Sequence, residues 1–323
     1  MKRILPTLFL VFLMVGCRSG DPRHSNAPSE YADTTKRNSI YHWKTTFAPD
    51  SSELDFLRRH NIERLYIKMF DVSVQRNHAE GTNDVIPIAT TRFEQPVPDG
   101  IDVVPVTYIT IEALKYMRGD EARYADLIVE RLMAMCSYNR LGTVSEIQLD
   151  CDWTSSTKES YNVLCRRVKE SLKEKGINFS VTVRLHQLSE SAPPANRGVL
   201  MLYNTGSITD FNTVNSILDM KDAKPYLKKT NYPIPLDYAY PVFGWGVRFK
   251  DQKFVSIVQQ SDTTFAENEY VRVERPSVQS VLAVKSLVEK QLGKPLSGNI
   301  LYHFDNRQLN NYTDYEIDQI ISY

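Results

Sequence analysis

The centre of the chain reads Glu146-Ile147-Gln148-Leu149-Asp150-Cys151-Asp152-Trp153, in which polar and apolar side chains alternate. Side chains alternate across a β-strand, so Asp150 and Asp152 share one face with Gln148, while the apolar side chains lie on the other face. Two carboxylates on one buried face are costly unless they are paired, hydrogen-bonded or functional. The stretch therefore predicts a strand that carries two candidate catalytic residues, or else a structural carboxylate pair held by Lys or Arg from a neighbouring strand.

Further stretches along the chain are rich in β-forming residues, and amphipathic segments typical of helices separate them. With the central stretch included, the predicted strands are residues 39–47, 64–72, 102–109, 146–153, 178–186, 199–204, 236–243 and 299–305. The predicted helices are residues 52–60, 120–138, 156–175, 210–218, 277–292 and 313–322. This alternation favours an α/β fold with parallel strands, and eight such units fit a (β/α)8 TIM barrel, with an open doubly wound α/β sheet as the alternative. Residues 249–273 interrupt the pattern and fit an inserted hairpin.

In a (β/α)8 barrel the chemistry lies at the carboxyl ends of the strands, where the loops converge. There the fifth predicted strand would direct Arg184 and His186 inward, beside Asp150 and Asp152. Arg184 is either a bidentate structural partner of the two carboxylates or a ligand-binding residue. His186 is a candidate general acid or base, with a hydrogen-bonded rim residue as the alternative. Lys68 of the second predicted strand could neutralise the same cluster.

Aromatic side chains also gather near the predicted strand ends. They are Trp43, Phe47, Phe70, Trp153, Tyr203, Tyr240, Phe243, Trp245 and Tyr302. Sugar rings stack their C–H faces on aromatic rings while their hydroxyls meet polar side chains, so the mixture suits a carbohydrate, although barrel packing also needs aromatics. The predicted substrate-binding residues are Trp43, Lys68, Arg184, Tyr203, Asn204, Trp245 and Asp305.

Two of these stretches resemble motifs of glycoside hydrolase family 18, the chitinases and endo-β-N-acetylglucosaminidases. Leu149-Asp150-Cys151-Asp152-Trp153 is similar to the end of that family's fourth-strand motif, DxxDxDxE, and Leu200-Met201-Leu202-Tyr203-Asn204 is similar to its sixth-strand Met-x-Tyr-Asp or Met-x-Tyr-Asn. The resemblance implies a barrel that acts on N-acetylhexosamine-containing glycans. It implies that Asp152 orients the substrate's N-acetyl group with Asp150 as its partner, and that Tyr203 and Asn204 contact the acetamido group.

The chain departs from the family motif at two positions. Thr154 stands where the acid that protonates the leaving oxygen is expected, and Ile147 replaces the motif's first Asp. Since a glycosidase needs a carboxylic acid at the leaving group, the chain either binds glycan without cutting it, takes its acid from elsewhere, or has different chemistry. The candidate replacement acids are Asp71, Glu112, Glu274 and Asp305.

The predicted function is therefore the handling of a glycan at the cell envelope, with Asp150, Asp152 and His186 as candidate catalytic residues if the protein is an enzyme. The alternative is a non-catalytic barrel that serves as an interaction or assembly scaffold. A third hypothesis, a metal-assisted hydrolase using the same three residues, lacks the His-x-His or His-Glu-x-x-His spacing typical of such sites. No cofactor and no metal are predicted.

The start of the chain predicts export. Met1-Lys2-Arg3 precedes an apolar run over residues 4–15, which is the charged start and short apolar middle of a signal peptide. Met14-Val15-Gly16-Cys17 resembles the bacterial lipobox, so residues 1–16 are predicted to be a lipoprotein signal peptide and Cys17 to carry the lipid. The alternative is a simple secretory signal with an incidental cysteine. Residues 17–38 are then predicted to be a flexible tether and residues 39–323 one barrel domain. The predicted location is a bacterial membrane, with the outer membrane favoured.

Charge and cysteine content exclude other classes of protein. Lys plus Arg and Asp plus Glu number 39 each, so the chain has no overall field that would recruit nucleic acid. Cys136, Cys151 and Cys165 show no CxxC or Cys/His spacing, which argues against a structural zinc site.

Overall fold

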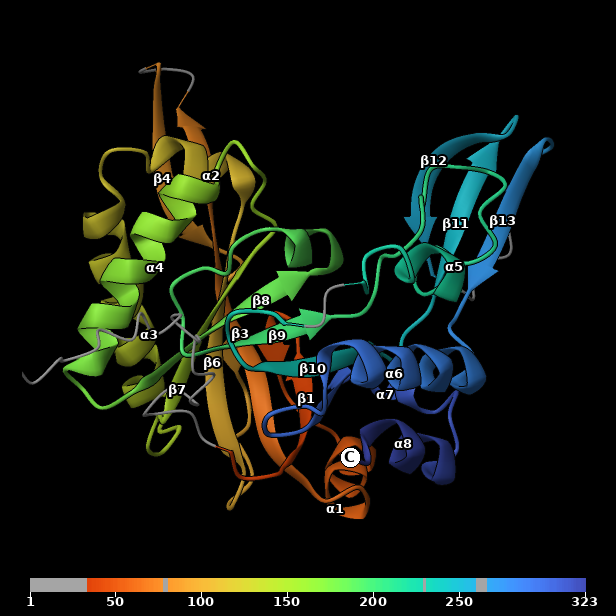
Figure 1. The fold of residues 1–323 in the computed structure, drawn as a ribbon, viewed down its shortest axis with the longest axis horizontal. Coiled ribbons are helices and arrows are strands. Elements are labelled where there is room, and N and C mark those ends of the chain that lie inside the picture. The colour runs from red at the N-terminus through yellow and green to blue at the C-terminus, as the bar shows by residue number, and fades with distance from the viewer. Residues whose placement is uncertain (1–33, 78–80, 229–230, 260–265) are drawn as a thin grey trace, which may run out of the picture.

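The computed structural model describes residues 34–77, 81–228, 231–259 and 266–323 (Figure 1). Within these ranges, eight parallel strands form a closed barrel in the order β1-β14-β10-β9-β8-β7-β6-β3, and β3 pairs with β1. They are β1 Asn38–His42, β3 Ile62–Asn77, β6 Asp102–Ile109, β7 Glu146–Cys151, β8 Asn178–Arg184, β9 Arg197–Met201, β10 Leu236–Pro241 and β14 Asn299–Tyr302. The predicted (β/α)8 barrel is confirmed, and closure between β1 and β3 rules out the open sheet.

Helices surround the barrel, with α3 and α4 on one side and α6 and α8 on the other (Figure 1). The longer ones are α1 Ser51–Arg59, α3 Glu121–Tyr138, α4 Lys158–Lys173, α6 Val278–Leu292 and α8 Asp314–Ile321. The short ones are α2 Ile111–Tyr116, α5 Met220–Ala223, α7 Asn306–Leu309 and the 3-10 turn η1 Leu185–Ser189. Two of the helices begin with a capping box, in which the side chain of Asp50 or Thr313 binds the first-turn amide of a Glu three residues later.

The predicted helix over residues 210–218 is wrong, because this segment forms a loop. Asp210 and Asn215 explain the difference. The Asp210 carboxylate accepts a hydrogen bond from the amide of Asn212, and the Asn215 side chain accepts bonds from the amides of Ile217 and Leu218. Short polar side chains that bind nearby backbone in this way compete with helix formation.

The interruption predicted at residues 249–273 is a separate sheet. Its three antiparallel strands lie in the order β12-β11-β13, beside α5 and away from the barrel axis (Figure 1). They are β11 Trp245–Lys250, β12 Lys253–Val258 and β13 Glu269–Glu274. Two smaller pairings complete the fold, since β4 Thr82–Ile88 runs antiparallel to the long β3, and β2 Thr46–Phe47 pairs with β5 Arg92–Phe93. The predicted strand over residues 39–47 is therefore split between β1 and β2.

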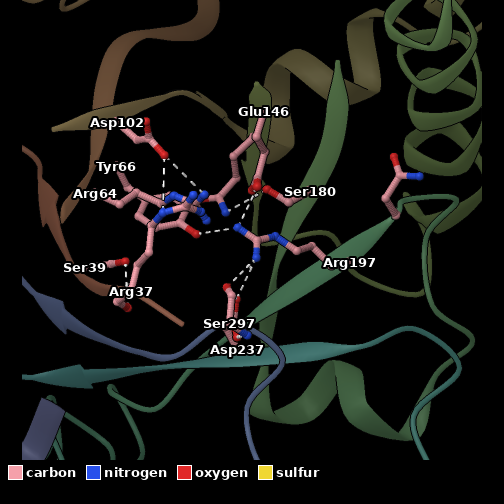
Figure 2. Close-up of polar contacts among 12 residues, drawn as sticks. Arg37, Ser39, Arg64, Tyr66, Asp102, Glu146, Ser180, Arg197, Asp237 and Ser297 are labelled. Atoms are coloured by element: carbon pink, nitrogen blue, oxygen red, sulfur yellow. Dashed lines mark hydrogen bonds and ion pairs between the residues drawn. The ribbon is translucent and has the colours of Figure 1, made fainter. Parts of the chain in front are cut away.

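An ionic network closes the amino end of the barrel (Figure 2). Arg197, whose side chain is 1% exposed, donates to Asp237 at 2.9 Å, to the Tyr66 hydroxyl at 2.9 Å and to the Ser297 hydroxyl at 2.6 Å, and it also pairs with Glu146. The two carboxylates are 2% and 1% exposed, so the cation between them compensates their burial. This end of the barrel is filled, which leaves the carboxyl ends of the strands as the open face.

The predicted signal peptide, and Cys17 with it, lie outside the described residues. Lys36 and Arg37, which the sequence assigns to the tether, contact the barrel domain: the Lys36 ammonium donates to the carbonyl of Pro295 at 2.6 Å, and the Arg37 amide donates to the carbonyl of Ser297 at 2.9 Å. Among the helices within the described ranges, none combines the length and apolar character needed to cross a membrane.

Candidate functional site

Two carboxylates and one arginine meet at the carboxyl ends of β7 and β8. The Arg184 guanidinium donates from Nη2 to Oδ1 of Asp150 at 2.8 Å and from Nε to Oδ1 of Asp152. Asp150 is 2% exposed, Arg184 is 15% exposed and Asp152 is 42% exposed. The arginine therefore bridges a buried carboxylate and one that reaches the surface, as the alternation along these two strands predicted.

Burial controls the electrostatics of this cluster. It raises the pKa of Asp150 above its ordinary value, while the Arg184 guanidinium and a hydrogen bond from the Thr182 hydroxyl act in the opposite direction. On the adjacent strand β6, the pKa of Tyr108 is raised to about 12, first by burial and then by the negative charges of Asp152 and Asp150. The phenol of Tyr108 thus stays protonated at neutral pH beside the two carboxylates.

Aromatic rings form a continuous row from β1 to β11 across the carboxyl end of the barrel, which is its mouth. Trp43 lies 5.9 Å from Tyr302, which stacks on Tyr203 at 4.6 Å. Tyr203 then meets Phe243 at 5.9 Å, and Phe243 meets Trp245 at 5.4 Å. The row joins three of the predicted substrate-binding residues by ring contacts.

Other aromatics of the predicted set are core residues. Phe47, Phe70, Trp153 and Tyr240 are at most 1% exposed. Trp153 lies on the outer side of β7, where its ring stacks on Tyr161 of α4 at 6.4 Å. These rings pack the barrel against its helices and are not available to a ligand.

A cavity of about 230 Å³ opens beside this cluster. Its lining residues are Asp152, Arg184, Leu185, His186, Tyr203, Asn204, Thr205 and Tyr226. Asn204 follows β9 with a φ of 56°, in the left-handed region that Asn tolerates better than most residues. The turn at Asn204 redirects the chain after β9 so that Thr205 continues the wall of the cavity.

His186 lines this cavity from a different position than predicted. β8 ends at Arg184, and His186 lies in η1 with an exposed side chain. Gln187 produces the turn, because its side chain accepts from the amide of Arg184 at 2.8 Å and donates to the carbonyl of Trp153 at 3.0 Å. The prediction that His186 continues the inward face of the strand is therefore wrong.

The position expected to carry the acid holds an exposed hydroxyl. The Thr154 hydroxyl lies 3.0 Å from the Ser156 hydroxyl. The backbone amide of Thr154 donates to the hydroxyl of Thr157 at 3.0 Å. Ile147, at the motif's first Asp, is fully buried in the core between sheet and helices. Neither side chain can donate a proton to a leaving group.

Lys68 lies at the mouth but binds a different carboxylate than predicted. Its ammonium is 3.2 Å from Asp71 and 5.8 Å from the centre of the Trp43 ring, while Arg184 takes the role at Asp150 and Asp152.

The replacement acids are all ion-paired. Asp305 caps α7 and pairs with Lys44 at 3.4 Å. Glu112 pairs with Arg76 at 2.8 Å, and Glu274 of β13 pairs with Arg272 at 2.6 Å. Glu274 also accepts from the Trp245 indole at 3.0 Å, so it anchors this predicted substrate-binding residue.

Several residues of the site were missed from the sequence. Thr182 lies two residues before Arg184, so the same alternation could have placed it beside Asp150. Thr205 and Tyr226 belong to an irregular loop, and no periodic pattern points to them. Within the described part of the chain, no group of three or more His, Cys, Asp or Glu side chains is arranged to hold a metal ion.

Comparison with known proteins shows which solved structures share this fold. A scan against protein-family models finds no match, and a search of curated proteins finds none either. Among solved structures, the spore cortex-lytic enzyme SleL of Bacillus cereus is 14% identical over 89% of this chain and 75% of its own, with a TM-score of 0.53. A chitinase from Chromobacterium violaceum is 13% identical over 88% of this chain and 98% of its own, with a TM-score of 0.53. The family 18 chitinase ChiB of Flavobacterium johnsoniae is 10% identical over 88% of this chain and 94% of its own, with a TM-score of 0.52. The chain therefore has the barrel fold of the family 18 chitinases.

Proposed function

We propose that this barrel binds an N-acetylhexosamine-containing glycan at its mouth and holds it without cleaving it. The observation that carries the proposal is the Arg184 bridge between Asp150 and Asp152, next to a threonine at the position of the acid. The bridge occupies both carboxylates of the motif that the chain retains.

Hydrolysis of a glycosidic bond requires a carboxylic acid that protonates the leaving oxygen. Thr154 has no such group, and Asp150 is too deeply buried to reach a substrate. Asp71, Glu112, Glu274 and Asp305 are all held in ion pairs with Lys or Arg. Among the described residues considered as the acid, none is therefore placed to protonate a leaving oxygen, while Asp152 and Asn204 remain available for binding.

A glycan fits the remaining chemistry of the mouth. Asp152 is 42% exposed and can accept hydrogen bonds from sugar hydroxyls or from an acetamido N–H. Asn204 supplies a second polar contact in the same cavity. Tyr203 and Tyr302 present ring surfaces on which the apolar face of a sugar can stack.

The proposal includes a location at the cell envelope, with a lipid on Cys17 as anchor. Support comes from the signal-peptide pattern and the lipobox-like residues 14–17. Expression in bacteria with a radiolabelled fatty acid should label the protein, and Cys17→Ser should abolish the label. A labelled Cys17→Ser variant would refute the anchor, whatever the barrel binds.

The test of function is a calorimetric titration of the purified protein with chitotriose, followed by chromatography for released sugar. Asp152→Asn should weaken binding at least tenfold, because a charge-assisted hydrogen bond contributes about 1.5–3 kcal/mol. Asp126→Asn is the matched control, since Asp126 on α3 is 47% exposed and is paired with Arg167 at 2.8 Å. It should bind like the unaltered protein.

The outcomes separate three functions. Binding without released sugar supports a glycan-holding barrel. Released sugar that Asp152→Asn abolishes would establish a hydrolase and refute the proposal. An absence of binding to chitotriose and to other N-acetylhexosamine glycans would also refute it, and would favour a scaffold at the envelope.

A further inference from the structure

The cavity beside Asp152 has a packed outer wall formed by the loop over residues 205–228. Ile217 and Leu227 of this loop are at most 1% exposed, so the loop has its own anchorage in the core. The amide of Asp219 donates to the Thr205 hydroxyl at 2.8 Å, which ties the start of the wall to its interior. Tyr226, which is 45% exposed, lines the cavity from this loop.

A second anchor ties the wall to the inserted sheet. The Glu274 carboxylate of β13 accepts from the amide of Ser216 at 2.9 Å and from its hydroxyl at 2.5 Å. Arg272 of the same strand donates to the carbonyls of Asp210 and Phe211 at 2.8 and 3.1 Å. The wall is thus held both by the core and by the inserted sheet.

The opposite side of the cavity is also built from fixed elements. Arg184 lies between two carboxylates, and His186 projects from the η1 turn that Gln187 holds in place. A cavity of about 230 Å³ is smaller than the roughly 300–1,000 Å³ of pockets that enclose drug-sized ligands. The cavity is open on one side, so one sugar ring can enter it while the rest of a longer glycan stays outside.

We propose that this cavity receives a single terminal N-acetylhexosamine ring, with the rest of the glycan leading out of the site. The inference rests on the proposed function and adds that recognition is end-on. The ring would lie between Tyr203 and Tyr226, with its polar edge toward Asp152, Asn204 and Thr205. Rings further along the glycan contribute little to affinity.

The experiment compares N-acetylglucosamine, chitobiose and chitotriose by calorimetric titration of the purified protein. The three affinities should agree within about threefold, because each ligand fills the cavity with one ring. Tyr226→Ala should weaken all three by about 3- to 10-fold, the loss expected for one aromatic contact. Tyr138→Ala is the control. Tyr138 is 86% exposed and ends α3 shortly before the amino end of β7, whereas the cavity lies at the carboxyl ends of the strands.

Each result has a distinct meaning. Affinity that rises tenfold or more with the second ring would overturn end-on recognition while leaving glycan binding intact. A Tyr226→Ala variant that unfolds at the unaltered temperature and binds like the unaltered protein would overturn the assignment of the wall. Failure of all three sugars to bind would overturn the proposed function, and the inference with it.

Discussion

Replacement of Arg184 by methionine tests whether this arginine compensates the buried charge of Asp150. Methionine keeps the length of the side chain and removes its charge. Asp150, which is 2% exposed, would keep only its hydrogen bond from Thr182. Removal of one partner from a buried ion pair costs about 3–5 kcal/mol, because the remaining charge is uncompensated. At a denaturant slope of about 3 kcal/mol/M, the urea midpoint should fall by about 1–1.7 M at pH 7.

The cost should depend on pH with a definite sign. Burial raises the pKa of Asp150 above its ordinary 3.8, and Arg184 is the main opposing influence, so its removal raises that pKa further. A carboxyl group with a raised pKa in the folded state destabilises the fold as the pH rises from 3.8 through the folded value. Below 3.8 the group is protonated in both states and the penalty disappears. The difference between Arg184→Met and the unaltered protein should therefore be smaller at pH 4 than at pH 7.

The assay is urea unfolding followed by tryptophan fluorescence at both pH values. Arg76→Met is the matched control, since Arg76 is 62% exposed and its partner Glu112 is 44% exposed. Its substitution should leave the urea midpoint close to that of the unaltered protein, as for other surface pairs. A loss of less than 1 kcal/mol for Arg184→Met at pH 7, or an equal loss at pH 4 and pH 7, would refute the assignment of Arg184 as the partner of buried Asp150.

Three further predictions use the same chain. Arg197→Met removes the cation that lies between two buried carboxylates at the amino end, so it should lower the free energy of unfolding by at least about 3 kcal/mol in the same urea assay; a smaller loss would contradict the network. Gly298→Ala places a Cβ 2.5 Å from the carbonyl oxygen of Arg37 at a φ of +153°, so thermal unfolding should begin several degrees lower; an unchanged melting temperature would contradict the close approach. Thr154→Glu restores the motif's acid but leaves Arg184 bridging the carboxylates, so we expect no released sugar on incubation with chitotriose; turnover would show that the bridge does not prevent catalysis.

The barrel could be predicted because its strands carry a simple signal. In β7 and β8 the polar side chains share one face of each strand, so the position of Arg184 beside Asp150 and Asp152 followed from alternation alone. Long amphipathic helices follow several of the strands, which favoured parallel strands joined by helices. Local periodicity therefore predicted the parallel α/β sheet and the centre of the site, while the pairing of β1 with β3 decided between the closed barrel and the open sheet.

The remainder of the site depends on contacts that no periodicity encodes. Gln187 ends β8 by binding the amide of Arg184, and this one side chain turns His186 out of the predicted inward face. Asn215 similarly converts a predicted helix into a loop through its hydrogen bonds to the following amides. Tyr226 reaches the cavity only because that loop folds back on the barrel, so the wall was absent from the prediction.

The two ends of the barrel show why residue types alone do not distinguish structure from function. At each end an arginine lies between two carboxylates: Arg197 at the amino end and Arg184 at the mouth. At the amino end Arg197 and both its acids are at most 2% exposed, so a ligand cannot reach any of them. At the mouth Asp152 is 42% exposed, so one arm of the Arg184 bridge can exchange its partner for a ligand while buried Asp150 retains the cation. The same ionic arrangement thus stabilises the fold at one end and, under the proposed function, would supply a preorganised binding group at the other. The difference is the exposure of the second carboxylate, which is buried at the amino end and 42% exposed at the mouth.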